Sequence, residues 1–250
     1  MDYDETDIAA TYDKARALAP ETVRLWRGLL SAHVGRSDIS LVVDLGCGTG
    51  RFTEILAEHF GVQVIGIDPS QKMVDQARRK PATVNVIYRQ GCAEALPLSD
   101  GSADLVWMSM VYHHLIDPSS TAKECHRVSR PGGYVCIRNT TRDSDFPHRH
   151  FFPGLQARID SELPSWQDIE SVFTAGGFTQ LVHQVVTQIT APDWQTFIEK
   201  SALRADSFLA RLSDEDFQHG MAAMRSTRDT FDQKAPVTEE VDWFVFRRQR

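Results

Sequence analysis

Three glycines after a short apolar run form the first group in this chain whose spacing could serve chemistry. The stretch Val42–Phe52 reads VVDLGCGTGRF, with Gly46, Gly48 and Gly50 at alternate positions. Glycines directly after a strand let a ligand approach the backbone closely. A dinucleotide fingerprint needs a small residue at its sixth position, where this chain has Arg51, and the loop lacks the Gly-Lys-Ser or Gly-Lys-Thr of phosphate-cradling loops. We expect a nucleotide-like ligand other than NAD, with a purely structural turn as the alternative.

A carboxylate and two histidines stand at the ends of two further apolar runs. The segment Gly66–Ser70 reads GIDPS, and one carboxylate such as that of Asp68 can accept hydrogen bonds from both hydroxyls of a ribose. His113 and His114 follow the run Asp104–Met110. Histidine titrates near neutral pH, so His113 is a candidate base or orienting group. A structural role for the pair is the alternative.

The elements that must position these residues alternate along the first half of the chain. Short β-rich runs that are apolar on both faces indicate a parallel sheet covered by helices. The expected strands are Ser40–Leu45, Val62–Ile67, Val84–Tyr88, Asp104–Met108 and Tyr134–Ile137. The amphipathic stretches between them are Phe52–His59, Gln71–Arg79 and Thr121–Ser129.

The flanking regions have other patterns. About Ile8 to Val34 reads as helical, split at Pro20. Asn139–Pro164 lacks a clean period and indicates a loop or short helices. A capping signal in Ser165–Glu170 opens a helix that ends at Gly176 and Gly177. We expect a strand at Thr179–Ile189 and a largely helical region at Pro192–Phe231. A final strand is expected at Val241–Phe246.

Composition narrows the classes of function. The chain has 250 residues with 42% hydrophobic and 24% charged residues, and no run approaches the length of a membrane-spanning helix. A net charge of −7 gives nucleic acid no general attraction. The acidic N-terminus lacks signal-peptide features, and the four dispersed cysteines form no metal-ligand spacing. We expect a cytoplasmic protein with no nucleic-acid partner, no membrane association and no metal.

Taken in order along the chain, these motifs resemble the class I S-adenosylmethionine-dependent methyltransferases. They include GCAEALPL at Gly91–Leu98 and HRVSRPGG at His126–Gly133, and the match runs from Tyr12 to Asn139. Within this class, the chain resembles the broad group that includes the quinone- and biotin-pathway methyltransferases. The resemblance implies a doubly wound, Rossmann-like α/β fold with a mostly parallel seven-stranded sheet and a helical insertion before the last strand. It implies one domain over 1–250, with lid helices at 1–36, a cofactor-binding core at 37–140 and cap segments at 141–164 and 190–235.

The resemblance also implies roles for individual residues. Asp68 would hold the ribose of S-adenosylmethionine, and Tyr12 would belong to the lid, with simple helix packing as its alternative. Cys92 stands where many relatives carry an acid, and a thiol accepts poorly from the adenine amino group. The full set of expected cofactor residues is Tyr12, Asp44, Gly46, Cys47, Gly48, Gly50, Asp68, Pro69, Met73, Cys92, Ala93, Glu94 and Ser109.

The function implied is methyl transfer to a small organic molecule by in-line displacement. Alternatives are a cofactor-modifying or decarboxylation-coupled use of the fold, and a non-catalytic S-adenosylmethionine-binding sensor or scaffold. His113 and His114 are the catalytic candidates. The acceptor chamber is expected above Ser109–His114, with apolar walls and a few polar groups. Its expected lining is Phe146, His148, Arg149, His150, Phe151, Phe152 and Trp194.

Overall fold

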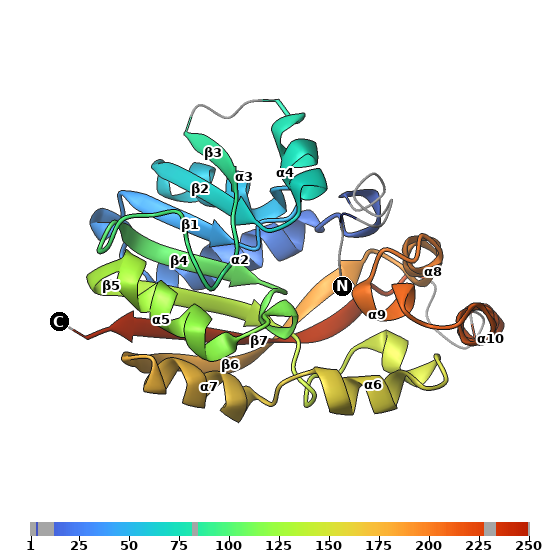
Figure 1. The fold of residues 1–250 in the computed structure, drawn as a ribbon. Helices are drawn as coiled ribbons and strands as arrows, with labels where there is room; N and C mark the ends of the chain where they lie inside the picture. Colours follow the sequence, from blue (N-terminus) through green and yellow to red (C-terminus); the bar gives the residue numbers. More distant parts are fainter. Residues whose placement is uncertain (1–3, 5–12, 82–84, 228–233, 250) are drawn as a thin grey trace.

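Strands from both halves of the chain form one twisted sheet in the computed structural model, which describes residues 4, 13–81, 85–227 and 234–249 (Figure 1). Within those residues, seven strands lie in the order β3-β2-β1-β4-β5-β7-β6, and only β7 runs antiparallel to its neighbours. The predicted doubly wound, mostly parallel sheet is therefore confirmed. The strands are β1 Leu41–Leu45, β2 Gln63–Asp68, β3 Val86–Gln90, β4 Ala103–Ser109, β5 Ser129–Asn139, β6 Phe178–Ala191 and β7 Val237–Arg248.

Two apolar clusters cover the two faces of this sheet, because successive side chains in a strand point to opposite faces. In β1, Val42 packs with helices α2 (Pro20–His33) and α3 (Arg51–Phe60). Its neighbour Val43 packs with α5 (Pro118–Val128) and α7 (Trp166–Ala175) on the other face. Helix α4 (Gln71–Arg78) packs beside β2 and β3. Strands β1, β2 and β4 are buried on both faces, which is why their sequences show no alternation, whereas the edge strands β3 and β6 are partly exposed.

Predicted element boundaries differ from the observed ones where local geometry is irregular. Strand β5 begins at Ser129, before the predicted Tyr134, because Ser129 pairs with Ala103 ahead of a register shift. Helix α5 begins at Pro118, since Asp117 caps it through the backbone N–H groups of Ser119 and Ser120. The predicted capping box at Ser165 is confirmed.

A helical cap lies beyond the carboxyl ends of the parallel strands (Figure 1). It contains the 3-10 helix η4 (Pro147–His150) and the helices α6 (Leu155–Glu162), α8 (Trp194–Ala202), α9 (Ser207–Ala210) and α10 (Asp214–Ser226). The four α-helices share an apolar core of their own with Phe146 and Phe152, which flank η4, and we call it the cap core. Its position over the carboxyl edge of the sheet places it beside the motifs singled out above. Among the described residues, no helix has the length and apolar character needed to cross a bilayer.

Candidate functional site

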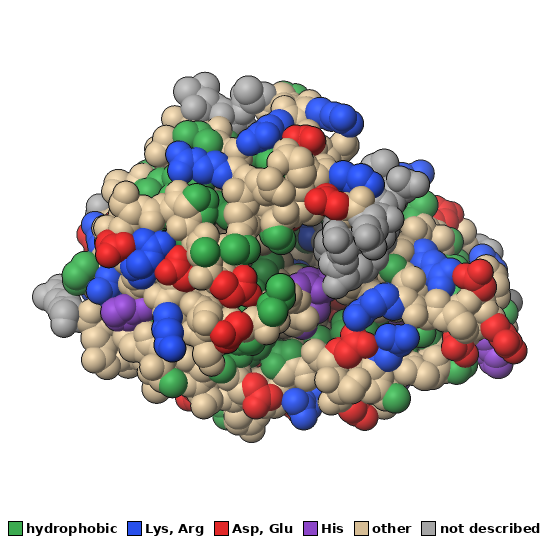
Figure 2. Space-filling model, in the orientation of Figure 1, with side chains coloured by type: hydrophobic (Ala, Val, Ile, Leu, Met, Phe, Trp, Pro, Cys, Tyr) green, Lys and Arg blue, Asp and Glu red, His purple; other side chains and the backbone are tan. Residues whose placement is uncertain are grey.

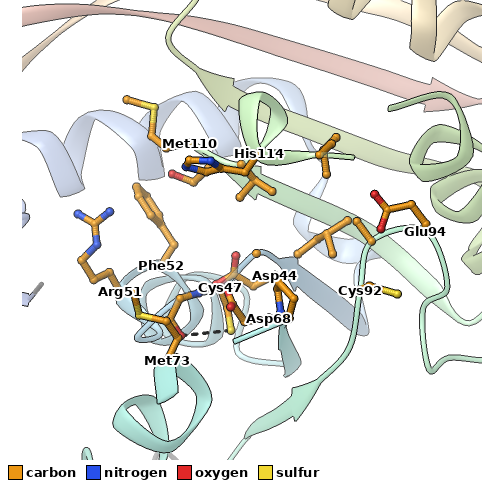
Figure 3. Close-up of a pocket in the computed structure, with 18 of the residues that line it drawn as sticks. Asp44, Cys47, Arg51, Phe52, Asp68, Met73, Cys92, Glu94, Met110 and His114 are labelled. Atoms are coloured by element: carbon orange, nitrogen blue, oxygen red, sulfur yellow. Dashed lines mark hydrogen bonds between the residues drawn. The ribbon is translucent and has the colours of Figure 1, made fainter. Parts of the chain in front are cut away.

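A cavity of about 180 Å³ opens at the carboxyl ends of β1, β2 and β4. Figure 2 shows a hollow on this face, with apolar side chains and a histidine at its edge. In Figure 3, Met110 and His114 lie across the cavity from Asp44, Cys47 and Asp68. The structure thus brings together most of the predicted cofactor residues, namely Asp44, Gly46, Cys47, Gly48, Asp68, Pro69, Met73, Cys92, Ala93, Glu94 and Ser109.

Of the predicted cofactor residues that the structure describes, only Gly50 is absent from this lining. Tyr12 lies outside the described residues. Gly50 is the N-cap of α3, and a Cβ there would come within 2.2 Å of the Tyr88 hydroxyl oxygen. Its role is close packing of the helix start against Tyr88. Sequence reasoning in turn missed cavity residues without a polar motif: Phe52, Val111, Leu115 and Ile116.

The glycine loop keeps its backbone open toward the cavity. Gly46 has a φ of +70°, and a Cβ there would come within 2.3 Å of Val111 Cγ2. Gly48 has a φ of +54°, and a Cβ there would meet no atom within 4 Å. Both conformations favour glycine. The first glycine permits close packing of the loop on the segment after β4, whereas the second presents bare backbone to empty space.

Asp68 lies at the end of β2 with its carboxylate held by the backbone. Its Oδ2 accepts from the Gly48 N–H at 2.8 Å, and its Oδ1 accepts from the Ser70 N–H at 2.9 Å. Burial raises the pKa of this carboxyl above its usual range. Because a carboxylate has about four acceptor sites, each oxygen can still accept from a ligand hydroxyl.

Asp44 is the second acid of the cavity and is more deeply buried. Its Oδ2 accepts from the Thr53 hydroxyl at 2.6 Å. Burial, with a smaller contribution from the nearby Asp68 carboxyl, raises the pKa of Asp44 to about 7, although the Thr53 hydrogen bond opposes this rise. A cationic group in the cavity would favour the ionised form of this carboxyl.

The rim of the cavity is fixed by two further contacts. Glu94 Oε1 accepts from the N–H groups of Ile116 and Asp117 at 3.2 and 3.3 Å, so this carboxylate holds the segment after His114 in place. At the end of β4, Arg138 Nη1 donates to the Ser109 hydroxyl oxygen at 3.0 Å. These bonds orient the ends of the loop and of β4 that face the cavity.

The two histidines line two adjoining cavities. His114 lines the first cavity and also a second one of about 50 Å³, whereas His113 lines only the second. Burial lowers the pKa of His113 to about 4 and that of His114 to about 2. The expectation that His113 titrates near neutrality is therefore wrong, because its ring is desolvated. Both imidazoles are neutral at pH 7.

The second cavity, which we call the chamber, is built from distant parts of the chain. Arg16 Nη1 pairs with Asp206 Oδ2 at 3.0 Å, and Asp206 Oδ1 caps α9 through the N–H of Phe208. Arg51 in turn donates to the backbone oxygen of Arg16, which links the chamber to the start of α3. The chamber lining is Arg16, Met110, His113, His114, Thr140, Phe146, His148, Ala205, Asp206, Ser207, Phe208 and Glu239.

Five residues expected in the chamber lie elsewhere. Phe152 and Trp194 are buried in the cap core, and Phe151 packs on Trp194 with ring centroids 5.4 Å apart. Arg149 donates to the Ser144 backbone oxygen at 2.5 Å, and the exposed His150 contacts Asp145 at 2.9 Å. The turn of η4 explains this, since it directs only Phe146 and His148 of this segment to the chamber.

Comparisons with known proteins identify the family to which the chain belongs. Residues 43–137 match the family model described as a methyltransferase domain. An uncharacterized methyltransferase-like protein of Schizosaccharomyces pombe is 32% identical over 181 residues, which cover 71% of this chain and 67% of that protein. The malonyl-(acyl-carrier protein) O-methyltransferase of Serratia marcescens is 34% identical over 204 residues, covering 76% and 71%.

The matched relatives differ in how much of their length this chain spans. The chain covers half or less of several other curated relatives. Among solved structures, a putative sarcosine dimethylglycine methyltransferase from Galdieria sulphuraria superposes with a TM-score of 0.66 at 15% identity, covering 98% of this chain and 99% of that one. At that identity the likeness concerns the fold.

Proposed function

The chain belongs to the class I S-adenosylmethionine-dependent methyltransferases, with S-adenosylmethionine as its cofactor, and on that premise we propose that it methylates a small organic molecule held in the chamber. The observation that carries the proposal is that the chamber and the cofactor cavity adjoin, with Met110 and His114 lining both. A molecule in the chamber lies next to whatever the first cavity holds.

The residues of the first cavity fit this cofactor. The bare backbone at Gly48 leaves room for a bulky ligand, and Asp68 retains acceptor sites for ribose hydroxyls. Met73 and Pro69 supply apolar surface, and the Asp44 carboxyl suits a cationic tail. We assign the ribose to Asp68 and the methionyl end to the Asp44 side of the glycine loop.

When bound, S-adenosylmethionine supplies an activated methyl group on a sulfonium. The protein's own contribution is to align the acceptor with that methyl and to exclude water. Two contacts of Asp13 support a part for the N-terminal segment in this enclosure: Thr49 donates to Asp13 Oδ1 at 2.5 Å, and Lys80 pairs with Asp13 at 2.9 Å. We propose that residues 1–36, including Tyr12, form a lid, that 37–140 bind the cofactor, and that 141–164 and 190–235 form the cap of one domain.

The dimensions of the chamber favour a small acceptor. A cavity of about 50 Å³ with Phe146 and Phe208 in its walls and a few polar groups suits part of a small organic molecule better than a polymer. The proposal is tested by measuring S-adenosylhomocysteine release with a panel of small hydroxyl, amine, thiol and carboxylate compounds. Tight cofactor binding without product from any of them would favour the non-catalytic alternative.

Cofactor choice gives a first prediction. S-adenosylhomocysteine should raise the midpoint of thermal unfolding, whereas NAD and NADP should leave it unchanged. The reason is that Arg51 lines the cavity at the position where a dinucleotide loop needs a small residue. A thermal-shift screen measures this. Stabilisation by NAD with none by S-adenosylhomocysteine would reverse the assignment.

Asp44 gives a second prediction, on proton linkage. Its pKa of about 7 leaves the free protein about half-protonated there at pH 7. A cationic cofactor favours the carboxylate, so binding should release about half a proton at pH 7, and affinity should rise with pH from about 6 to 8. Calorimetry in two buffers of different ionisation enthalpy measures the release. Asp44→Asn should abolish it, and equal release from that variant would exclude Asp44 as the source.

A further inference from the structure

The tautomer of His113 follows from its hydrogen-bond partner. Asn139 Nδ2 donates to the Thr140 backbone oxygen at 2.7 Å, so the other side-chain atom of Asn139 is the acceptor oxygen. That oxygen accepts from the Tyr112 N–H at 3.2 Å and contacts His113 Nδ1 at 3.3 Å. His113 Nδ1 must therefore carry the proton. In the neutral ring Nε2 is then a bare acceptor, and it has no hydrogen-bond partner among the described residues.

His148 is the opposite tautomer, with its proton on Nε2. The Ser201 hydroxyl has one proton, which it donates to the Phe197 backbone oxygen at 2.8 Å. The same hydroxyl oxygen lies 2.8 Å from His148 Nε2, so it accepts from that nitrogen. His148 Nδ1 is then the bare acceptor of a ring whose pKa burial lowers. This nitrogen, too, has no hydrogen-bond partner in the described part of the chain.

Two carboxylates of the chamber, those of Asp206 and Glu239, are further acceptors. The Arg16 guanidinium pairs with Asp206, and the Thr140 hydroxyl donates to Met110 Sδ at 3.5 Å. Glu239 contributes a carboxylate that accepts one bond, from Gln188 Nε2 at 2.6 Å. A ligand that complements two bare imidazole nitrogens and a carboxylate must itself donate hydrogen bonds.

We propose that the methyl acceptor is a hydroxyl compound, whose reacting O–H donates to His113 Nε2 while a second donor group of the same molecule meets His148 Nδ1. This inference rests on the proposed function. A hydroxyl suits these groups better than an amine does. A hydroxyl oxygen keeps lone pairs while it donates, whereas an ammonium has none until it loses a proton. Because burial lowers the pKa of His113 to about 4, its imidazole cannot remove that proton beforehand.

The reaction balances with these groups alone. A lone pair of the hydroxyl oxygen forms the new O–C bond as the C–S bond breaks, and that bond's electrons remain on sulfur. The hydroxyl proton passes to His113 Nε2 and then to solvent. The products are a methyl ether and S-adenosylhomocysteine.

Two substitutions each remove one acceptor nitrogen of the chamber and keep the hydrogen bond that orients the side chain. His113→Asn keeps a donor at the Nδ1 position for Asn139 but removes Nε2. His148→Gln keeps a donor at the Nε2 position for Ser201 but removes Nδ1. His150→Gln is the matched control, since His150 is exposed on the same 3-10 helix and lies outside the chamber.

The experiment uses the full chain saturated with S-adenosylhomocysteine. Long-range proton–nitrogen NMR spectra should show an unprotonated Nε2 on His113 and an unprotonated Nδ1 on His148. Phenol should then bind about tenfold more tightly than fluorobenzene, which has the same shape but no donor. Each chamber variant should reduce that preference to near unity, and His150→Gln should retain it. In turnover with an identified hydroxyl acceptor, His113→Asn should lower kcat about 100-fold.

Reversed tautomers, or equal or unmeasurable binding of phenol and fluorobenzene, would overturn the hydroxyl assignment. Methylation of amines alone would overturn it as well, yet would leave the proposed methyltransferase function standing. Conversely, the expected tautomers and the preference for phenol would support the chamber as a binding site for hydroxyl compounds, even if no acceptor in the panel were methylated. In that case it is the proposed catalytic function that fails.

Discussion

Asp68→Ala should weaken S-adenosylmethionine binding by about 2–4 kcal/mol, or roughly 30- to 900-fold in Kd. The carboxylate is 7% exposed and is held at the cavity wall by the N–H groups of Gly48 and Ser70. Removing it deletes charged hydrogen bonds to the ribose and leaves those hydroxyls without a partner. Calorimetric titration measures the change.

The control for this prediction is Asp75→Ala, which removes an exposed acid from the helix that follows. Asp75 bonds Gln71 and lies 3.6 Å from Arg78, and it does not line the cavity. Its removal should leave cofactor affinity unchanged. Circular dichroism should accompany both variants, because Asp68→Ala also leaves the backbone N–H groups of Gly48 and Ser70 without this acceptor. Unchanged affinity in a folded Asp68→Ala protein would remove Asp68 from the cofactor site.

The cofactor cavity was predictable from the sequence because its determinants are local. Asp44 lies near the end of β1, Gly46 and Gly48 follow that strand, and Asp68 ends β2. Parallel strands bring their carboxyl ends to one edge, so short motifs at successive strand ends must meet there. The apolar character of these strands on both faces identified the sheet for the same reason, as Val42 and Val43 illustrate.

The chamber could not be predicted in this way. Arg16 and Asp206 are separated by 190 positions, and neither stands in a motif. Their meeting depends on how the N-terminal segment and the cap fold over the sheet. The protonation of His113 was misjudged for a related reason: its pKa depends on burial by those same segments, whereas the sequence shows only the residue type.

The adjacent aromatic residues of the cap show a further limit of sequence patterns. Phe151 and Phe152 lie in a stretch without a helical or strand period, so nothing in the sequence distinguishes their environments. In the structure, Phe152 is 4% exposed within the cap core, whereas Phe151 is only partly buried beside it. The expectation that both line the acceptor chamber is wrong for each of them, since η4 turns the chain between His148 and this pair.

Phe152→Ala should therefore lower the free energy of unfolding by about 3–4 kcal/mol, whereas Phe151→Ala should lower it by less than about 1.5 kcal/mol. The Phe152 ring stacks on Phe217 with centroids 6.0 Å apart, and it packs so closely on Gly220 that a Cβ there would lie 2.2 Å from Phe152 Cδ1. Truncating Phe152 leaves a cavity in rigid surroundings, whereas truncating Phe151 mainly removes one contact with Trp194. Urea unfolding of the two variants measures the difference.

Cofactor binding provides the second readout for this pair. Neither phenylalanine lines the cofactor cavity or the chamber, so S-adenosylhomocysteine affinity should match that of the unsubstituted protein in both variants below the unfolding transition. Equal destabilisation by the two substitutions would contradict the difference in burial. If instead Phe152→Ala impaired methylation of an identified acceptor at unchanged stability, the ring would have to reach the chamber. Phe152 would then contact the acceptor directly, as Phe146 and Phe208 of the cap core are placed to do.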